Sequence, residues 1–448
     1  MPARAATPRP FDGEAALRHA AALAALGPHP WGSPRGQAAA QYVAARFREA
    51  GLQEVHLQSF ESHGHQGSNV IGVLPARGGR TAEFVVVGAH HDTAPQAPGA
   101  YDDGGGVGVL IEAARALAAA RARPRTLVFV SWDGEEAWST GQTLTAGSRA
   151  YLASLGADAR GMVAAFVVEM CGWSRGRPVL HPIAYPDPLR PGAPVIAPAW
   201  LVRAAQRGAA SAGVGAPVGD PWISWLYQPA VRTFRVGLYG DDLSFLQGGR
   251  PALFTSDSSF TAYYPFYHLP ADTADKLDPA ALARAGRLTL GVVEALAREP
   301  AGPMPEPDWF SIFGTVLGRS ALLAIGVLSL APALYAAARR GGPAFGVRLA
   351  QAAAFGLLLW RHPVPALWVF LLPNLAPLVR PRVGTTIVAA LPLLSLAGVG
   401  LLAGLRGMAS GLWIAWWELA LAALALVLAL ARPGRGARET RPRSGRRR

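Results

Sequence analysis

The chain has 448 residues, of which 51% are hydrophobic and 16% charged, and its mean hydropathy is +0.22. This composition is too apolar for an ordinary soluble protein and points to membrane segments. The net charge is +13, but eight arginines lie in the segment 432–448. The chain therefore lacks the evenly basic character of a nucleic-acid-binding protein. Because Cys171 is the one cysteine, no intramolecular disulfide can form.

The first 300 residues alternate helix-like and strand-like segments. Residues 1–27 contain a short Ala/Leu run broken by charges, which predicts an amphipathic helix rather than a secretory signal. Four apolar, β-rich runs follow, separated by helix-like stretches such as 107–120; the runs are 81–90, 125–132, 161–170 and 250–256. Such runs are typical of strands buried on both faces of a sheet. We predict an α/β fold with a mixed, mostly parallel sheet flanked by helices.

Polar side chains follow each of the four runs. In chain order they are His90 and Asp92, then Asp133, Glu135 and Glu136, then Glu169, and finally His268 in the loop after the fourth run. In α/β sheets, ligands bind beyond the carboxyl ends of the strands. The sequence therefore predicts that these side chains converge on one site.

The residue types at this site predict a metal centre. His90 and Asp92 are two residues apart, so they share a face, and Asp92 would orient the imidazole. Asp102 and Asp103 precede a glycine run that lets the backbone turn tightly, and a carboxylate there would bridge two cations. Of the adjacent Glu135 and Glu136, one would bind metal and the other face the substrate as a base. Zinc suits histidine and carboxylate ligands, as would cobalt or manganese.

Several segments, taken in order, resemble the zinc aminopeptidases of peptidase family M28. The resemblance covers about residues 11–298 and rests on GPHPWGSPRG, SNVIGVL, GAHHDT, PGAYDDGGGVG, DGEE, GSRAYL, FLQGGRPALF and YHLPADTADKLD. It implies the zinc exopeptidase fold, two zinc ions and a peptide substrate that is cleaved at its amino terminus.

The resemblance also implies a role for each matching metal ligand. His90 would bind one zinc, and Glu169 would complete the ligands of that ion. Glu136 and His268 would bind the other zinc, and Asp102 would bridge both. Histidine and carboxylate ligands of this kind are usual for zinc.

The resemblance also implies which side chains take part in catalysis. Glu135 would be the general base and Asp92 would orient His90, while Tyr267 would stabilise the oxyanion or simply pack among its neighbours. The sequence departs from the family pattern at Glu169, where aspartate is usual. It also has a longer segment at 137–146, and Asp241-Asp242 replaces an aspartate-histidine pair.

Two other functions stay open. A glutaminyl-cyclase-like transferase has the same fold with one zinc, and the presence of both His90 and Asp102 argues against it. A catalytically inactive receptor or membrane scaffold would have lost ligands, and none is missing. The number of metal ions bound per chain distinguishes the first alternative from the peptidase.

The composition changes near residue 300. Residues 1–299 would form the peptidase domain, 300–309 a proline-rich linker and 432–448 a basic tail. Between linker and tail, long apolar runs predict an all-α transmembrane region with a lipid bilayer around it. Its roughly five spans are 310–338, 344–360, 363–379, 383–405 and 411–431, of which the second and third would also fit one broken hairpin.

Arginine placement predicts the orientation of these spans. Arginines follow the first, third and fifth spans more densely than the opposite loops, which hold Arg361 and Arg406. This places the tail in the cytoplasm and the peptidase domain outside a bacterial plasma membrane. Because no export signal opens the chain, either an amino-terminal anchor precedes Met1 or the number of spans is even, and we favour the anchor.

Overall fold

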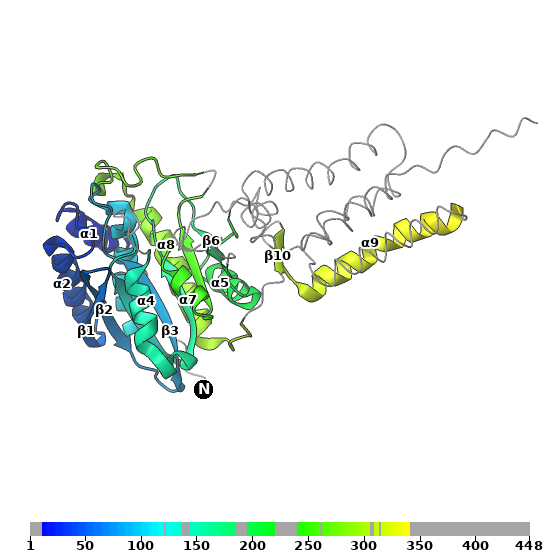
Figure 1. Ribbon diagram of the computed structural model, residues 1–448, viewed down its shortest axis with the longest axis horizontal. Helices are drawn as coiled ribbons and strands as arrows, with labels where there is room; N and C mark the ends of the chain where they lie inside the picture. Colours follow the sequence, from blue (N-terminus) through cyan, green and yellow to red (C-terminus); the bar gives the residue numbers. More distant parts are fainter. Residues whose placement is uncertain are drawn as a thin grey trace, which may run out of the picture. The chain divides into compact units, whose positions relative to one another are not determined.

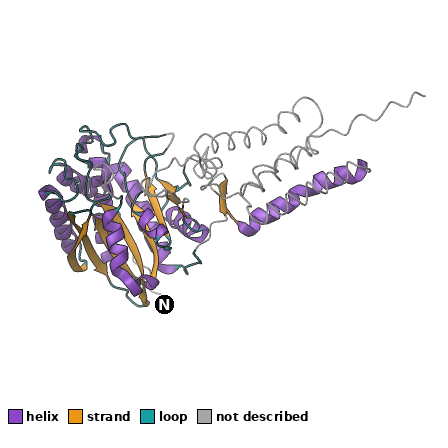
Figure 2. Cartoon of the chain, viewed as in Figure 1, coloured by secondary structure: helices purple, strands orange, loops and turns teal. Residues whose placement is uncertain are grey.

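In the computed structural model, the described residues are 11–120, 122–136, 144–184, 195–219, 240–259, 262–304, 309–312 and 315–340. The chain divides into two compact units, Met1–Leu317 and Gly318–Arg448. The first unit contains a seven-stranded sheet with helices packed on it (Figure 1), and strands and helices form separate layers (Figure 2).

The sheet confirms the predicted mixed, mostly parallel arrangement. Its strand order is β1-β2-β4-β3-β5-β9-β6. The bounds are β1 (Gln53–Ser62), β2 (His65–Leu74), β3 (Arg80–His90), β4 (Arg125–Trp132), β5 (Met162–Val168), β6 (Val179–His181) and β9 (Ala252–Ser256). The central strands β4, β3, β5 and β9 pair in parallel, whereas β2 and β6 run antiparallel to their neighbours. The four apolar runs are therefore the four parallel strands.

Burial explains which strands the sequence revealed. Every residue of β5 and of β9 is buried, so both faces of these strands are covered by other parts of the protein. Strand β1 lies at the edge of the sheet, and its residues are exposed or half-buried. Because an edge strand needs no continuous apolar run, β1 was not among the four predicted strands.

Helices cover both faces of the sheet. The helices α3 (Gly105–Ala118) and α8 (Pro279–Arg298) contact the central strands on one face. Around them lie α1 (Gly13–Ala24), α2 (Pro34–Glu49) and α5 (Ala199–Ser211), while α4 (Ala146–Leu155) and α7 (Asp242–Gln247) pack on the opposite face (Figure 1). Side-chain caps begin α1, α2 and α8, where Asp12, Ser33 and Asp278 accept backbone N–H groups of the first turn.

The segment after residue 309 differs from the sequence prediction. Two short strands, β10 (Trp309–Ile312) and β11 (Thr315–Gly318), pair with each other, and α9 (Arg319–Arg340) follows them. A helical span beginning at residue 310 is therefore wrong. The aromatic and β-branched residues of this stretch favour strand. The remaining paired strands are β7 (Ile183–Ala184) and β8 (Val195–Ile196).

Among the helices that the structure describes, none has both the length and the apolar character needed to cross a bilayer. The four predicted spans between 344 and 431, and the tail, lie outside the described residues.

Pro303 and Trp309, from the range predicted as a linker, lie within the first unit and form hydrogen bonds there. The Trp200 indole N–H donates to the carbonyl of Pro303 at 3.1 Å. The fully buried Trp309 indole N–H donates to the carbonyl of Ala197, at the start of α5, at 2.8 Å. The domain limits drawn from the sequence stay a prediction.

Gly88 in β3 provides a test of the packing beneath the site. A Cβ atom there would lie 2.0 Å from the ring of Trp132, which is fully buried and cannot move aside. We expect Gly88→Ala to lower stability by about 1–3 kcal/mol, the usual effect of overpacking, measured as a lower thermal unfolding midpoint. The control is Gly215→Ala, because a Cβ at Gly215 meets nothing within 4 Å. Equal effects of the two substitutions would contradict this packing.

Candidate active site

The predicted site residues lie beyond the carboxyl ends of the parallel strands. His90 is the last residue of β3, Glu135 and Glu136 follow β4, and Glu169 follows β5. Asp102 lies in the turn Ala100–Gly104 that leads into α3. The parallel pairing of β3 with β4 and β5 brings these strand ends together.

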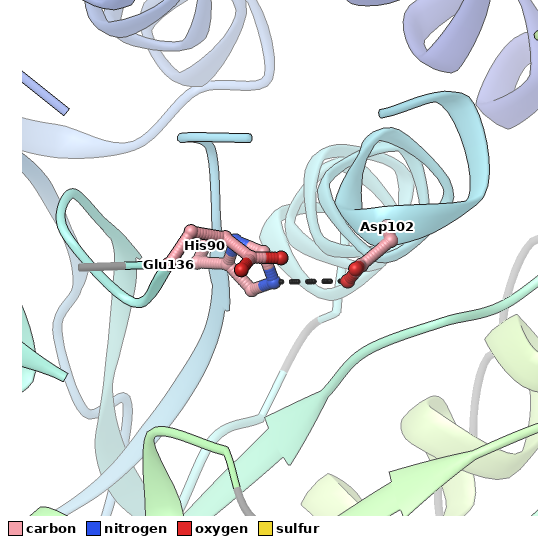
Figure 3. A group of neighbouring side chains, drawn as sticks. All are labelled: His90, Asp102 and Glu136. Carbon is pink, nitrogen blue, oxygen red and sulfur yellow. Dashed lines mark ion pairs between the residues drawn. The ribbon is translucent and has the colours of Figure 1, made fainter. Parts of the chain in front are cut away.

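Three of the predicted metal ligands form a compact buried group. Ligand atoms of His90, Asp102 and Glu136 all lie within 4.8 Å of one another. His90 Nε2 is 3.3 Å from Asp102 Oδ1, and the Glu136 carboxylate lies beside the imidazole (Figure 3). Zinc bonds of about 2.0–2.2 Å place neighbouring ligand atoms of a tetrahedral site roughly 3.3–3.6 Å apart. The donor types, and the distance between His90 and Asp102, therefore fit a zinc ion.

His268 joins this group from the loop after β9. Its Nε2 atom is 3.1 Å from Asp102 Oδ2 and 2.7 Å from Glu136 Oε1. His90 and His268 thus lie against different oxygens of the same Asp102 carboxylate. A carboxylate that faces one imidazole with each oxygen suits a position between two cations. Four of the five predicted ligands are therefore together.

Glu169, the fifth predicted ligand, contacts a different segment. It is buried, and its Oε1 atom accepts the backbone N–H of Asp241 at 3.2 Å. A Cβ atom on Gly240 would lie 2.3 Å from the same oxygen. The extra methylene of Glu169 relative to aspartate is thus accommodated because residue 240 has no side chain. Among the described residues, the compact ligand group does not include Glu169.

Asp92 holds the loop that carries the two glutamates. Its Oδ1 accepts the N–H of Glu135 at 3.1 Å, and its Oδ2 accepts the N–H of Glu136 at 3.0 Å. His90 Nδ1 lies 3.1 Å from the backbone carbonyl of Asp92 and 3.5 Å from its carboxylate. The residue therefore fixes the imidazole mainly through its carbonyl, and its carboxylate positions the β4 loop.

Glu135 and Tyr267 complete the predicted set. The Glu135 side chain is buried, and burial raises its pKa well above the ordinary value, helped by the nearby charges of Glu169 and Glu136. The ring of Tyr267 stacks on that of His268 with centroids 3.8 Å apart. Burial, and then the Asp102 and glutamate carboxylates, raise the Tyr267 pKa, so its hydroxyl keeps its proton.

In the metal-free protein, Glu136 and His268 hold protons at neutral pH. Burial, with Asp102 nearby, raises the pKa of Glu136 to about 8. Burial opposes the charge on His268, but its bonds to Asp102 and Glu136 outweigh this and raise its pKa to about 10. Protonation here offsets the repulsion between buried carboxylates, which a bound cation would do more directly.

Two contacts at the site involve residues to which the sequence analysis assigned no role. Gln96 donates its side-chain amide to the carbonyl of His268 at 2.9 Å. Asp272, four residues after His268, accepts backbone N–H groups from the turn that carries Asp102. Asp272 belongs to the segment YHLPADTADKLD, but its partners are far away in sequence and only the fold reveals them.

The sequence is similar to a known peptidase family and to several of its relatives. The model of peptidase family M28 matches residues 69–293. A vacuolar membrane protease of Laccaria bicolor is 32% identical over 139 residues, which are 28% of this chain and 13% of that protein. Leucine aminopeptidase 1 of Ajellomyces capsulatus is 31% identical over 148 residues, or 30% of this chain and 36% of that protein. The match thus spans well under half of either relative.

Solved structures share the fold. A zinc aminopeptidase from Bacillus subtilis has a TM-score of 0.52 at 15% identity, covering 63% of this chain and 95% of that one. A glutaminyl cyclase from Fimbriiglobus ruber has a TM-score of 0.51 at 19% identity, covering 66% of this chain and 99% of that one. These likenesses confirm the predicted zinc exopeptidase-like fold.

The raised pKa of Glu136 predicts a pH dependence for the metal-free protein. From pH 4.5 to about 8 the folded state binds a proton that the unfolded state has lost, so stability falls as pH rises. Metal binding requires the ionised carboxylate and becomes tighter over the same range. We therefore expect the gap between the unfolding midpoints of zinc-loaded and chelated protein to widen from pH 5 to pH 8. A constant gap would contradict the assignment, and Glu136→Gln should reduce the slope in chelated protein.

Proposed function

This chain belongs to peptidase family M28, and on that premise we propose that it is a di-zinc metalloexopeptidase that removes amino-terminal residues from peptides. The observation that carries the proposal is the shared carboxylate of Asp102. One oxygen faces His90 at 3.3 Å, the other faces His268 at 3.1 Å, and Glu136 adjoins both. This arrangement supports two adjacent cations with one bridging ligand.

The ligands would divide between two sites. His90 and Glu169 would hold one ion, Glu136 and His268 the other, and Asp102 both. Glu169 would have to exchange its bond with the Asp241 N–H for a metal bond, or make both with its two oxygens. Two zinc ions, or cobalt or manganese in their place, would polarise the scissile carbonyl and lower the pKa of the attacking water.

Side chains of the protein would carry out the proton transfers and stabilise the developing negative charge. Glu135 would take a proton from the attacking water and deliver it to the nitrogen of the leaving amine. Burial raises the pKa of Glu135 in the metal-free protein, and two cations nearby would lower it, so that the carboxylate is free to accept that proton. The hydroxyl of Tyr267, which keeps its proton, would donate a hydrogen bond to the oxygen on which negative charge develops. The free amine of the substrate would meet the acidic cluster.

A variant of Glu135 tests this assignment. Glu135→Gln keeps the size of the side chain and removes its basicity. We expect hydrolysis of aminoacyl anilides to fall roughly 10²–10⁴-fold while elemental analysis still finds two zinc ions per chain. Glu61→Gln, at an exposed position of β1, is the control and should retain full activity. Wild-type rates in the Glu135 variant would refute the mechanism.

A glutaminyl-cyclase-like transferase is the second candidate. Two observations favour keeping it: a solved glutaminyl cyclase shares the fold, and Glu169 lies outside the compact ligand group. One zinc ion per chain, with cyclisation of amino-terminal glutamine, would establish it. Neither metal nor activity towards aminoacyl, carboxyl-terminal or glutaminyl substrates would instead favour an inactive receptor or scaffold.

We also propose that the apolar runs between residues 344 and 431 anchor the protein in a bacterial plasma membrane, with the tail in the cytoplasm. These four runs are an even number of spans, so a peptidase domain on the outside requires one further crossing, which none of the described helices provides. The support is the sequence, since these runs lie outside the described residues. One curated relative is itself named a vacuolar membrane protease. Full-length protein is expected to stay in the membrane fraction after alkaline carbonate extraction. Its release into the supernatant would contradict the anchor.

A further inference from the structure

A single buried residue accepts the N–H groups of three consecutive residues beside the site. The backbone carbonyl of Asp272 accepts the N–H of Ala100 at 3.2 Å. Its Oδ1 accepts the N–H of Tyr101 at 2.9 Å, and its Oδ2 accepts the N–H of Asp102 at 3.3 Å. Asp272 has no exposed surface. One residue thus supplies every acceptor for the stretch that ends at Asp102.

These bonds matter because the turn cannot supply them itself. Asp102 has φ −121° and ψ 87°, which is outside the helical region. Backbone N–H groups buried without an acceptor are strongly destabilising. The Asp272 carboxylate therefore stabilises this backbone conformation by accepting the buried N–H groups. The backbone conformation at Asp102 in turn sets the direction of the Asp102 side chain.

Asp272 also belongs to the loop that carries His268. Its own N–H donates to the carbonyl of Leu269 at 2.9 Å, which closes a turn directly after His268. His268 has φ 58°, in the left-handed region that non-glycine residues rarely adopt. Such a conformation persists only where the surroundings hold it. The same residue therefore ties the His268 turn to the Asp102 turn.

Tyr264 fixes the orientation of the Asp272 carboxylate. Its hydroxyl donates to Asp272 Oδ1 at 2.9 Å, and both side chains are buried. The Tyr264 ring stacks on Tyr101 with centroids 4.1 Å apart and planes at 27°. The carboxylate thus receives donors from two different segments and cannot rotate without breaking one of these bonds.

We propose that Asp272 is a positioning residue that sets the distance between the Asp102 carboxylate and the His268 imidazole, and so prepares the site for metal. The inference rests on the proposed function, because it concerns the affinity of that same metal site. Asp272 acts through the backbone of one ligand and the turn of the other, because its carboxylate is bonded to the Tyr101 and Asp102 N–H groups and to the Tyr264 hydroxyl.

The substitution Asp272→Asn tests the proposal with almost no change in shape. The amide has one acceptor oxygen, so in either orientation its NH₂ group faces the N–H of Tyr101 or of Asp102. We expect chelator-stripped full-length protein to bind Zn²⁺ at least tenfold more weakly, measured by competition with a chelator. The visible absorption spectrum of the Co²⁺-loaded variant should also change, since it reports ligand geometry.

Asp278→Asn is the matched control. Asp278 also accepts a backbone N–H through its carboxylate, that of Ala280 at 2.8 Å, but there it caps α8. Because asparagine caps helices about as well as aspartate, this substitution should leave the unfolding midpoint, the Zn²⁺ affinity and the Co²⁺ spectrum close to those of the wild type. If Asp272→Asn lowers the unfolding midpoint without changing affinity or spectrum, its role is structural only and the proposal is overturned.

If the Asp272 variant does not fold, the substitution Tyr264→Phe tests the positioning role of Asp272 instead. It removes one donor to the carboxylate and keeps the aromatic stack. Zn²⁺ affinity should fall several-fold, and unchanged affinity would overturn the proposal. The wild-type measurement separates the two hypotheses. Wild-type protein that binds no Zn²⁺ defeats the proposed function, whereas tight binding that both variants retain defeats only the role of Asp272.

Discussion

The burial of several carboxylates at one edge of the sheet is the constraint on which the site depends. Asp102, Glu135, Glu136 and Glu169 are each at most 6% exposed, and each lies at the end of a strand or in the turn before α3. Burying an ionised carboxylate is unfavourable unless an opposite charge or several donors compensate. His90 and His268 lie against these carboxylates and can carry positive charge, and cations would complete the compensation.

Other buried aspartates around the site act as acceptors for the backbone. Asp92 holds the N–H groups of Glu135 and Glu136, and Asp103 Oδ1 accepts those of Gly106 and Met170 at 3.0 Å. Asp133, Asp257 and Asp272 hold the N–H groups of Ser68, Gly172 and the Asp102 turn in the same way. Each of these carboxylates joins two segments distant in sequence. The acidic cluster thus serves as a scaffold as well as a ligand set.

Glu169 shows how a substituted ligand is accommodated. A longer side chain at the end of β5 needs room, and Gly240 supplies it because a Cβ atom there would lie 2.3 Å from the carboxylate. The N–H of Asp241 then holds the same oxygen. Residues 169 and 240 should therefore be considered together. A side chain at position 240 and a glutamate at position 169 are sterically incompatible in this arrangement.

The sequence alone determined the parallel strands, the helices between them and the cluster that contains His90, Asp102 and Glu136. The reason is local: strands buried on both faces need continuous apolar runs, and polar residues at their ends stand out against them. Edge strand β1 and the paired strands after residue 308 lack that signal, and the sequence did not reveal them. The tertiary structure decided that Glu169 contacts the Asp241 segment, and that Asp272 binds the turn of Asp102 across 170 residues of chain. Neither contact has a sequence signature, because each depends on which loops the sheet brings together and on a bond between a side chain and a backbone N–H that any residue could provide.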